Sequence, residues 1–199
     1  MSSAREEILR SLRAAGVAPH PRPEPHARVA AASRDEQVAR FEQMLREAGG
    51  ELHCAAGAEV AAVVRSLPAC ARARRIVSFV PELLASTVSP LPSDVRALAD
   101  VDFALLSGEI GVTENGAVWV SAEDPVRRAS AFLAEHVALV LHAQDLAWDL
   151  HEAYARLADR DLPSFGSFVC GPSKTADIEQ ALVIGAHGPR SLAVVLVAA

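Results

Sequence analysis

Residues His136–His142 have the sequence HVALVLH, in which two histidines enclose an unbroken run of aliphatic side chains. Such runs are typical of strands that are buried on both faces, as in a parallel sheet. Other strand-like segments lie on both sides of it in the sequence, at 51–55, 75–80, 102–106, 165–170 and 191–197. Helix-like segments alternate with these strands, so the sequence predicts an α/β fold with a mostly parallel sheet flanked by helices.

Three segments after residue 32 have the apolar periodicity of helices. Ser33 and Glu36 form a capping box that begins the first helix, which ends at Gly49-Gly50. Residues 59–67 form the second helix, and residues 146–157 form a long amphipathic third. The 199-residue chain has no internal repeat and is long enough for one domain with a substantial core. We therefore expect a single α/β domain over residues 33–199.

The first 32 residues have a different character. Ser3 and Glu6 form a capping box, and apolar residues on one face indicate a short amphipathic helix. Four prolines then alternate with other residues between Pro19 and Pro25, which predicts a stiff, extended segment. We interpret residues 1–32 as a helix on a proline-rich arm. The helix is free to pack on the body or on a second subunit, which leaves a homo-oligomer open.

Composition and charge exclude several classes of function. The net charge is −6 and no stripe of Lys and Arg is present, so nucleic acid and anionic membranes are poor candidates as partners. Three cysteines lie far apart, which argues against a disulfide framework, a zinc site or an iron–sulfur cluster. His136 and His142 bracket a strand and are interpreted as strand-end residues. We predict no metal and no cofactor in this chain.

No apolar run is long enough to span a bilayer, and the charged N-terminal residues do not resemble a secretion signal. A cytoplasmic location is therefore expected, and reduced thiols agree with it. A Gly-x-Gly-x-x-Gly fingerprint for a flavin or nicotinamide cofactor is also missing.

The first candidate site begins at Gly171-Pro172, directly after a predicted strand. Proline suits the first turn of a helix, so Ser173, Lys174 and Thr175 would crowd a helix start. Free backbone amides, the helix dipole and a lysine together favour an anion, and ligands of open sheets bind at the carboxyl ends of strands. We predict that Gly171, Ser173, Lys174 and Thr175 bind a small anion. The alternative is that both hydroxyls only cap the helix while Lys174 faces solvent.

Two candidate acid–base residues follow. Asp177 lies one helical turn from Ser173 and Lys174 and is a candidate general base, or else a carboxylate that merely complements the helix dipole. His187 lies in a glycine-rich turn, and histidine is a residue type that serves as an acid or a base in catalysis, so it is a candidate catalytic group. Gly188 would allow a ligand to approach its backbone closely. The alternative for His187 is a loop histidine bonded to a backbone carbonyl.

The third candidate site is Glu114-Asn115-Gly116. Asn-Gly between two β-prone runs is a strong signal for a hairpin with a two-residue turn, which makes Glu114 a strand-end carboxylate. The functional alternative is that this turn projects Glu114 into a pocket, with Asn115 and Gly116 against the ligand.

The segments 171–179 and 185–189, together with Glu135-His136-Val137, resemble the LUD domain (lactate utilization) family and its lactate utilization protein C type. The resemblance extends from about Ser33 to the end of the sequence. It implies a Rossmann-like fold similar to the sugar-phosphate isomerase and CoA-transferase (NagB/RpiA/CoA-transferase-like) group. It also implies a role in oxidising L-lactate to pyruvate, beside partner proteins that carry the iron–sulfur clusters.

The chain departs from the family at Glu114-Asn115-Gly116-Ala117, where members commonly have Glu-Thr-Gly-Thr. The remaining Glu-Asn-Gly is similar to that of class I CoA-transferases, which implies Glu114 as a nucleophile on a thioester. Three functions stay open: a subunit of a lactate-oxidising system, a stand-alone enzyme on a small phosphorylated, carboxylated or CoA-linked substrate, and a non-catalytic interaction module.

Overall fold

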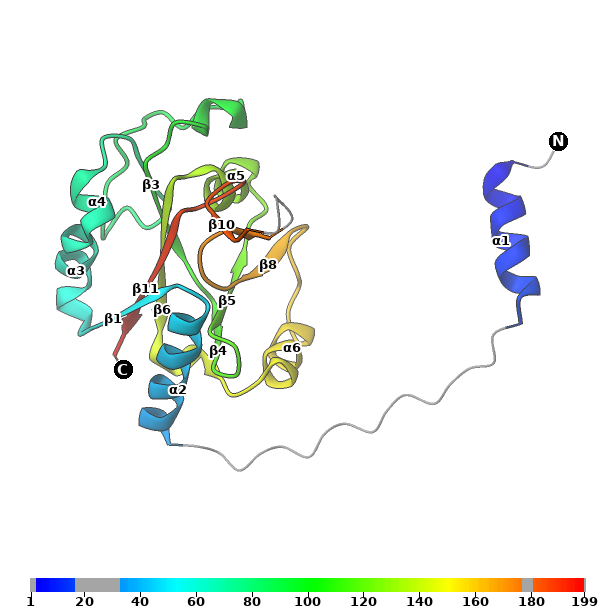
Figure 1. Ribbon diagram of the computed structural model, residues 1–199, viewed down its shortest axis with the longest axis horizontal. Helices are drawn as coiled ribbons and strands as arrows, with labels where there is room; N and C mark the ends of the chain where they lie inside the picture. Colours follow the sequence, from blue (N-terminus) through cyan, green and yellow to red (C-terminus); the bar gives the residue numbers. More distant parts are fainter. Residues whose placement is uncertain (1–2, 17–32, 177–180, 199) are drawn as a thin grey trace. The chain divides into compact units, whose positions relative to one another are not determined.

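The computed structural model describes residues 3–16, 33–176 and 181–198 (Figure 1). The chain separates into two compact units, Met1–Ala30 and Ala31–Ala199. Helix α1 (Ala4–Ala14) belongs to the first unit and begins with the capping box of Ser3 and Glu6. Its apolar side chains Ile8 and Leu12 are 60% and 65% exposed. The proline-rich segment lies outside the described residues.

A five-stranded parallel sheet forms the centre of the second unit. Its strand order is β1 (Glu51–Ala55), β11 (Ser191–Val197), β6 (His136–His142), β3 (Phe103–Ser107) and β2 (Ile76–Ser78). Each neighbouring pair is parallel. The prediction of an α/β fold with a mostly parallel sheet is therefore confirmed, and the run HVALVLH is the middle strand of that sheet.

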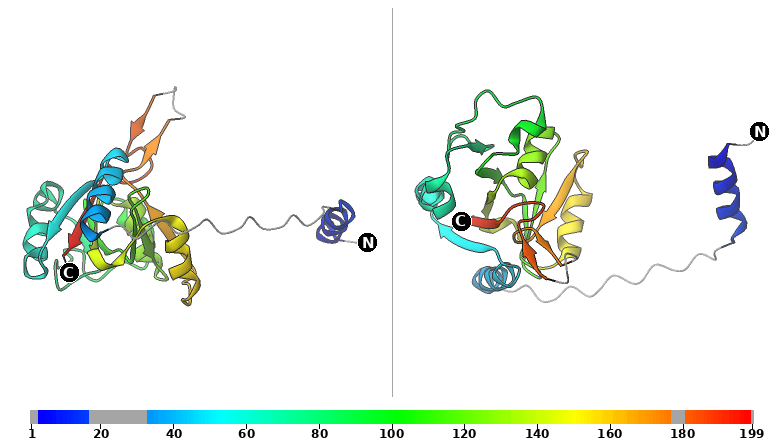
Figure 2. Two further views of the ribbon diagram at one scale, coloured as in Figure 1. Left: turned by 90° about the horizontal axis from the view of Figure 1, so that it is seen from below. Right: turned by 45° about the horizontal axis from the view of Figure 1, so that its top comes forward.

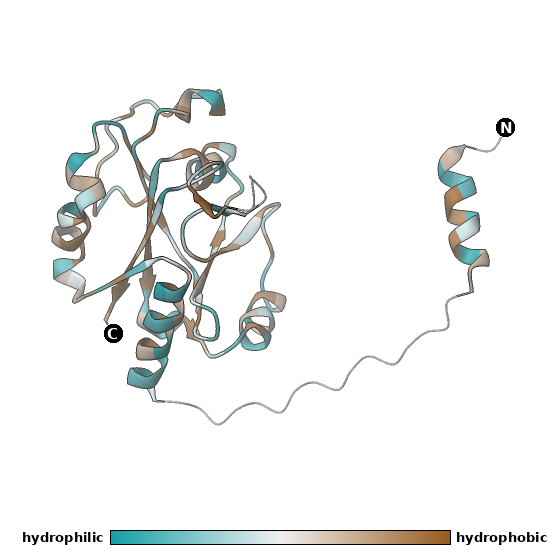
Figure 3. Ribbon diagram, viewed as in Figure 1, coloured by the Kyte–Doolittle hydropathy of each residue, from teal (hydrophilic) through white to brown (hydrophobic). Residues whose placement is uncertain are grey.

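Side chains of these strands alternate between two apolar cores, one on each face of the sheet. Helices α3 (Val60–Ser66) and α4 (Pro68–Arg72) cover one face, following the 3-10 turn η1 (Gly57–Glu59). Helices α2 (Arg34–Glu47) and α5 (Pro125–Leu133) cover the other (Figure 1). Apolar colour follows the central strands, whereas the helices also carry polar residues (Figure 3). Burial on both faces explains why the strands read as continuous apolar runs.

A second sheet has the order β7 (Leu146–Ala147), β4 (Ile110–Val112), β5 (Ala117–Ser121) and β8 (Gly166–Val169). Strands β4 and β5 form the predicted antiparallel hairpin, but Val112 pairs with Ala117, so the turn covers residues 113–116 and is longer than the two-residue Asn115-Gly116 turn expected. The Asn115 side chain accepts a hydrogen bond from Ala117 N at 3.0 Å, and Gly116 has φ 71°. Asn115 and Gly116 thus stabilise the turn itself, one through a side-chain bond to the backbone and the other through its positive φ.

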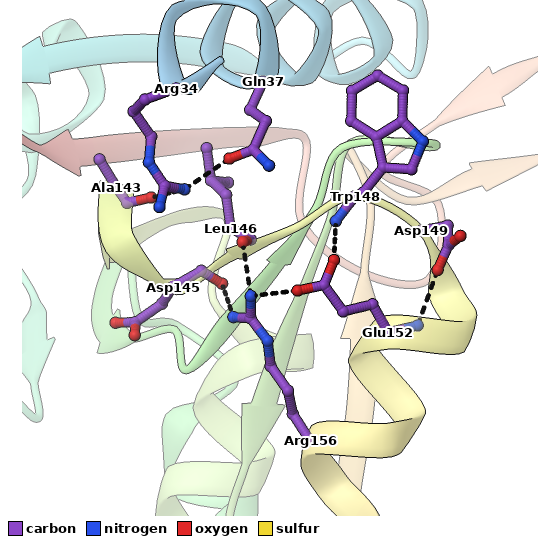
Figure 4. Close-up of polar contacts among 9 residues, drawn as sticks. All are labelled: Arg34, Gln37, Ala143, Asp145, Leu146, Trp148, Asp149, Glu152 and Arg156. Carbon is purple, nitrogen blue, oxygen red and sulfur yellow. Dashed lines mark hydrogen bonds and ion pairs between the residues drawn. The ribbon is translucent and has the colours of Figure 1, made fainter. Parts of the chain in front are cut away.

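The long helix predicted over 146–157 begins later, as α6 (Leu150–Ala158). Leu146 and Ala147 pair with β4 instead, so sheet formation overrides the helical periodicity there. The preceding segment, with the 3-10 turn η3 (Ala143–Asp145), is held by arginines (Figure 4). Arg156 donates to the carbonyls of Asp145 and Leu146 at 3.3 and 3.0 Å and pairs with Glu152.

Helix α2 is fastened to the same segment. Arg34 Nη1 donates to the Ala143 carbonyl at 2.8 Å and to Gln37, whereas Glu152 accepts a hydrogen bond from Trp148 N at 2.8 Å (Figure 4). These bonds fix the chain as it leaves β6. Another 3-10 turn, η2 (Val95–Leu98), precedes β3.

Residues after Gly171 form a hairpin rather than the predicted helix start. Strand β9 (Lys174–Thr175) pairs antiparallel with β10 (Val183–Ile184). Figure 2 shows this hairpin standing out from the second unit, beyond the end of α2. The helix prediction was wrong because the Gly-Pro bend leads into a strand whose partner lies several residues further along the chain.

Candidate functional site

The parallel sheet has two ends that differ chemically. The carboxyl ends of its strands form one end, which includes Ser78, Ser107 and His142, and their amino ends form the other, which includes His136 and Ser191. We call these the carboxyl edge and the amino edge. The candidate segments 171–175 and 185–189 lie toward the amino edge, because Pro189 lies two residues before the start of β11 and its carbonyl accepts a hydrogen bond from Ser173 N. The expectation that Gly171 lies at a carboxyl end of the parallel sheet was wrong, since it follows β8 of the second sheet.

Gly171 and Lys174 contact the C-terminal end of α2. Gly171 has φ 77°, and a Cβ there would lie 2.2 Å from the Ala48 carbonyl oxygen. A Cβ on Gly49 would lie 3.4 Å from the Lys174 ammonium nitrogen. Carbonyls at a helix C-terminus lack helical partners and carry partial negative charge, which a lysine complements. Lys174 was predicted to lie at the positive N-terminus of a helix. It lies instead beside the negative C-terminal end of α2.

Ser173 and Gly188 lie side by side, so the two glycine-containing turns do come together. Ser173 N donates to the Pro189 carbonyl at 2.8 Å, and Gly185 N donates to the Ser173 carbonyl at 2.8 Å. A Cβ on Gly188 would be 3.0 Å from Ser173 Cβ. His187 is exposed in the same turn. Thr175 lies in β9, and Asp177 lies outside the described residues.

Glu114 is engaged with the start of α6. Its Oε2 accepts a hydrogen bond from Leu150 N at 3.1 Å, in the first turn of that helix. The Asn115 carbonyl accepts a hydrogen bond from the Cys170 thiol at 2.9 Å. A Cβ on Gly116 would lie 2.4 Å from Leu45 N, in the last turns of α2. The end of α2 therefore joins the turn at 114–116 to Gly171, which sequence spacing did not predict.

Cys170 lies between these two candidate segments. Burial raises the pKa of its thiol, and the nearby Lys174 ammonium opposes that shift in part. A raised thiol pKa keeps the group protonated at neutral pH, which agrees with its role as a donor to Asn115. Cys170 is thus a hydrogen-bonding residue of this neighbourhood and not a thiolate.

A polar cluster at the carboxyl edge was missed by sequence reasoning. Arg127 of α5 donates from Nη2 to Ser107 Oγ at 2.7 Å and to the Ser107 carbonyl at 3.2 Å. Its Nε donates to the Ser121 carbonyl at 3.1 Å, and its guanidinium lies 5.5 Å from the centre of the Phe79 ring. Burial lowers the pKa of Arg127, whereas Glu109 and Asp124 act in the opposite direction.

Glu109 completes this group. One carboxylate oxygen accepts a hydrogen bond from the Ser121 hydroxyl, and the other is 3.5 Å from Arg160 Nη1. Ser121 therefore links Glu109 to Arg127. We call Ser107, Glu109, Ser121 and Arg127 the carboxyl-edge cluster. The sequence feature that could have indicated this cluster is Ser107-Gly108-Glu109, which directly follows the predicted strand 102–106.

The cluster pairs a cation with an acceptor at the edge where open parallel sheets bind ligands. The contacts of Arg127 occupy Nε and Nη2, which leaves Nη1 for a carboxylate. Among residues 3–16, 33–176 and 181–198, no group of three or more His, Cys, Asp or Glu side chains is placed to hold a metal ion. No helix in the described part of the chain is long and apolar enough to cross a membrane.

An open parallel sheet with a polar carboxyl edge and a second small sheet defines this chain as an α/β protein. The LUD domain family model matches residues 94–197, slightly more than half of the chain, and the chain therefore belongs to the LUD domain family. The matched region contains the carboxyl-edge cluster and both the β4–β5 and the β9–β10 hairpins.

Curated relatives match part of the chain at low identity. Lactate utilization protein C of Bacillus licheniformis is 31% identical over 110 residues, which cover 52% of this chain and 45% of that protein. Its counterpart in Shouchella clausii is 28% identical over 92 residues, covering 44% and 40%. Protein YkgG of Escherichia coli, described as uncharacterized, is 35% identical over 88 residues, covering 41% and 37%. Each match thus spans less than half of the relative's length.

A solved structure has a similar fold. The DUF162 family protein from Deinococcus radiodurans matches with a TM-score of 0.59 and 20% identity, covering 84% of this chain and 99% of that one. This likeness shows the α/β fold of the second unit and extends well beyond the segment matched by the family model.

Proposed function

We propose that this protein is a subunit of a lactate utilization system that binds a small 2-hydroxy or 2-oxo acid at the carboxyl-edge cluster. Similarity to relatives named lactate utilization protein C supports the assignment to a lactate utilization system. One observation carries the ligand class: Arg127 and Glu109 meet through Ser121 at the carboxyl edge.

The chemistry of lactate matches that pairing. Its carboxylate requires a cationic donor, which Arg127 offers through Nη1, because the contacts with Ser107 and Ser121 use Nη2 and Nε. Its hydroxyl requires an acceptor, which the Glu109 carboxylate or the Ser107 hydroxyl offers. Pyruvate retains the carboxylate but replaces the hydroxyl donor by an acceptor, so Glu109 should favour lactate over pyruvate.

Oxidation of L-lactate to pyruvate releases two electrons, which need a carrier. We assign these electrons to partner proteins with iron–sulfur clusters, as the family resemblance implies, and no cofactor to this chain. A cytoplasmic location and a fold related to sugar-phosphate isomerases and CoA-transferases belong to the same proposal. The parallel sheet flanked by helices supports the fold assignment.

Isothermal titration of the purified chain with L-lactate, pyruvate and acetate tests the ligand. We expect lactate to bind most tightly and Arg127→Gln to weaken it by about tenfold or more, because a charge-assisted hydrogen bond is worth roughly 1.5–3 kcal/mol. Arg128→Gln, on the same helix, is the matched control because Arg128 contacts the Phe165 ring instead. Equal losses in both variants, or no binding by the wild-type chain, would contradict the proposal.

A stand-alone enzyme is the second candidate, and the convergence of Ser173 with the turn of His187 favours it. Such an enzyme would turn over a phosphorylated, carboxylated or CoA-linked substrate without partners. Its activity should disappear in His187→Ala and persist in Arg127→Gln. Inactivity of the pure chain against a panel of acyl-CoA and sugar-phosphate substrates would remove this candidate.

A further inference from the structure

A pocket lies at the amino edge of the parallel sheet, at the end opposite the carboxyl-edge cluster. It has a volume of about 180 Å³ and lies between the start of α4 and the first residues of four strands. Its apolar wall includes Leu67, Phe103, Val137 and Leu192. A shallower depression of about 310 Å³ shares Ala69, Arg72 and His136 with it and opens beside it.

Two polar side chains are paired in this pocket. His136 and Ser191 are the first residues of β6 and β11 and lie opposite one another in the parallel register. His136 Nδ1 lies 2.7 Å from Ser191 Oγ, which leaves Nε2 unused by this contact. In one tautomer Ser191 donates and Nε2 carries a hydrogen, and in the other the Ser191 hydroxyl hydrogen is released. Either arrangement retains one donor for an anion.

Arg72 supplies the positive charge. Its side chain is exposed, lines both the pocket and the depression, and makes no hydrogen bond or ion pair within the described ranges of the chain. An unpaired guanidinium beside a hydroxyl and an imidazole is a set of donors suited to an oxyanion.

Nearby carboxylates are already engaged with other groups. Asp102 accepts hydrogen bonds from the amides of Arg74 and Arg75 at 2.7 and 2.8 Å. Glu135 pairs with Arg190 at 2.7 Å, and Glu51 lies 3.5 Å from His53 Nε2. No ion pair among the described residues joins Arg72 to one of these carboxylates, which leaves its guanidinium to pair with an external anion.

We propose that this amino-edge pocket binds the phosphate group of a small phosphomonoester. A phosphate has three terminal oxygens, so two can face Arg72 while the third accepts from the His136–Ser191 pair. A carboxylate has one oxygen fewer. The volume exceeds that of a phosphate alone, and the apolar wall accommodates a short carbon skeleton. This site is separate from the proposed lactate site, which lies at the other end of the sheet.

NMR of the histidine ring protons tests the site with inorganic phosphate as the probe, at neutral pH and constant ionic strength. The His136 signals are assigned with His136→Gln. We expect a saturable shift of these signals, and Arg72→Ala should weaken phosphate binding by about tenfold or more. Arg74→Ala is the matched control, because its side chain is exposed and does not line the pocket; it should change affinity less than about twofold.

Three results would overturn the proposal: no shift of His136 at about 50 mM phosphate, equal losses in Arg72→Ala and Arg74→Ala, or acetate binding as tightly as phosphate. Arg127→Gln separates this site from the lactate site. It should leave the phosphate response of His136 unchanged even if lactate binding is lost, and a matching loss of both would contradict two independent sites. Amide spectra of each variant verify the fold.

Discussion

Gly116 lies against Leu45 so closely that a Cβ on the glycine would be 2.4 Å from the Leu45 backbone nitrogen. Backbone atoms cannot move aside as a flexible side chain can. The tip of the β4–β5 hairpin is therefore seated directly on the last turns of α2, and the position of Glu114-Asn115 depends on that contact.

We expect Gly116→Ala to lower the free energy of unfolding by about 3 kcal/mol, because the methyl group meets backbone and φ is positive. Gly57→Ala is the control, since a Cβ there has no atom within 4 Å. Urea unfolding monitored by tryptophan fluorescence measures both. Equal stabilities of the two variants would show that the hairpin can move off α2.

Glu114 is expected to act as a capping carboxylate of α6 and to form no covalent intermediate. Glu114→Ala should lower the free energy of unfolding by about 1 kcal/mol, and Glu114→Gln by less, because glutamine retains an oxygen acceptor for Leu150 N. Exposed Glu123→Ala serves as the control. Mass spectrometry after incubation with acetyl-CoA checks the chemistry, and an adduct on Glu114 would support the nucleophile interpretation instead.

Asp102 should make stability depend on pH in the acid range. Backbone hydrogen bonds from Arg75 and then Arg74 hold the pKa of its carboxyl below the ordinary value in the folded protein. A lowered folded pKa contributes stability above the unfolded pKa, and this contribution is lost as pH falls through the folded pKa. Asp102→Asn should therefore be less stable than wild type at neutral pH, with the gap narrowing in acid.

Thermal unfolding between neutral and acid pH measures this gap. Glu82→Gln, at an exposed position, should leave the pH dependence unchanged. A gap between wild type and Asp102→Asn that is constant across the whole range would show that the carboxylate charge does not matter.

The three thiols should alkylate slowly at neutral pH, because burial raises the pKa of Cys54, Cys70 and Cys170. Lys174 lowers the pKa of Cys170, so Lys174→Ala should raise that pKa and slow alkylation of Cys170 further. Cys54 in the same sample is the internal control. Iodoacetamide labelling followed by peptide mass spectrometry measures the rates, and faster labelling of Cys170 in the variant would reverse the assigned sign.

Local signals predicted much of the fold. The strand at His136–His142 and the hairpin around Asn115-Gly116 were predicted correctly, because burial on both faces and turn-forming residues are visible in neighbouring positions, although the turn has four residues rather than two. The segment after Gly171 was not, since a Gly-Pro bend is equally compatible with a helix or a strand, and the pairing of Lys174 with Ile184 decides between them. The prediction that Leu146 begins a helix was wrong for the same reason, because Leu146 pairs with Gly111 in β4.

Candidate sites were harder to predict than strands. The carboxyl-edge cluster gathers Ser107, Glu109, Ser121 and Arg127 from two strand ends, a loop and a helix, and only the strand order brings them together. The contact between Ser173 and Gly188 likewise follows from the folded structure. Which ligand, if any, these residues bind stays a prediction, as do the roles of Lys174, Asp177 and His187.

The position of β11 between β1 and β6 has a consequence for how the protein is made. Among the described strands, β1 pairs with β11 alone, although about 140 residues separate the two along the chain. Until the ribosome has released Ser191–Val197, β1 has no partner and one side of β6 is an open strand edge. During synthesis the chain therefore passes through a stage in which the apolar strand β6 has an unpaired edge, a feature that favours aggregation in partly folded chains.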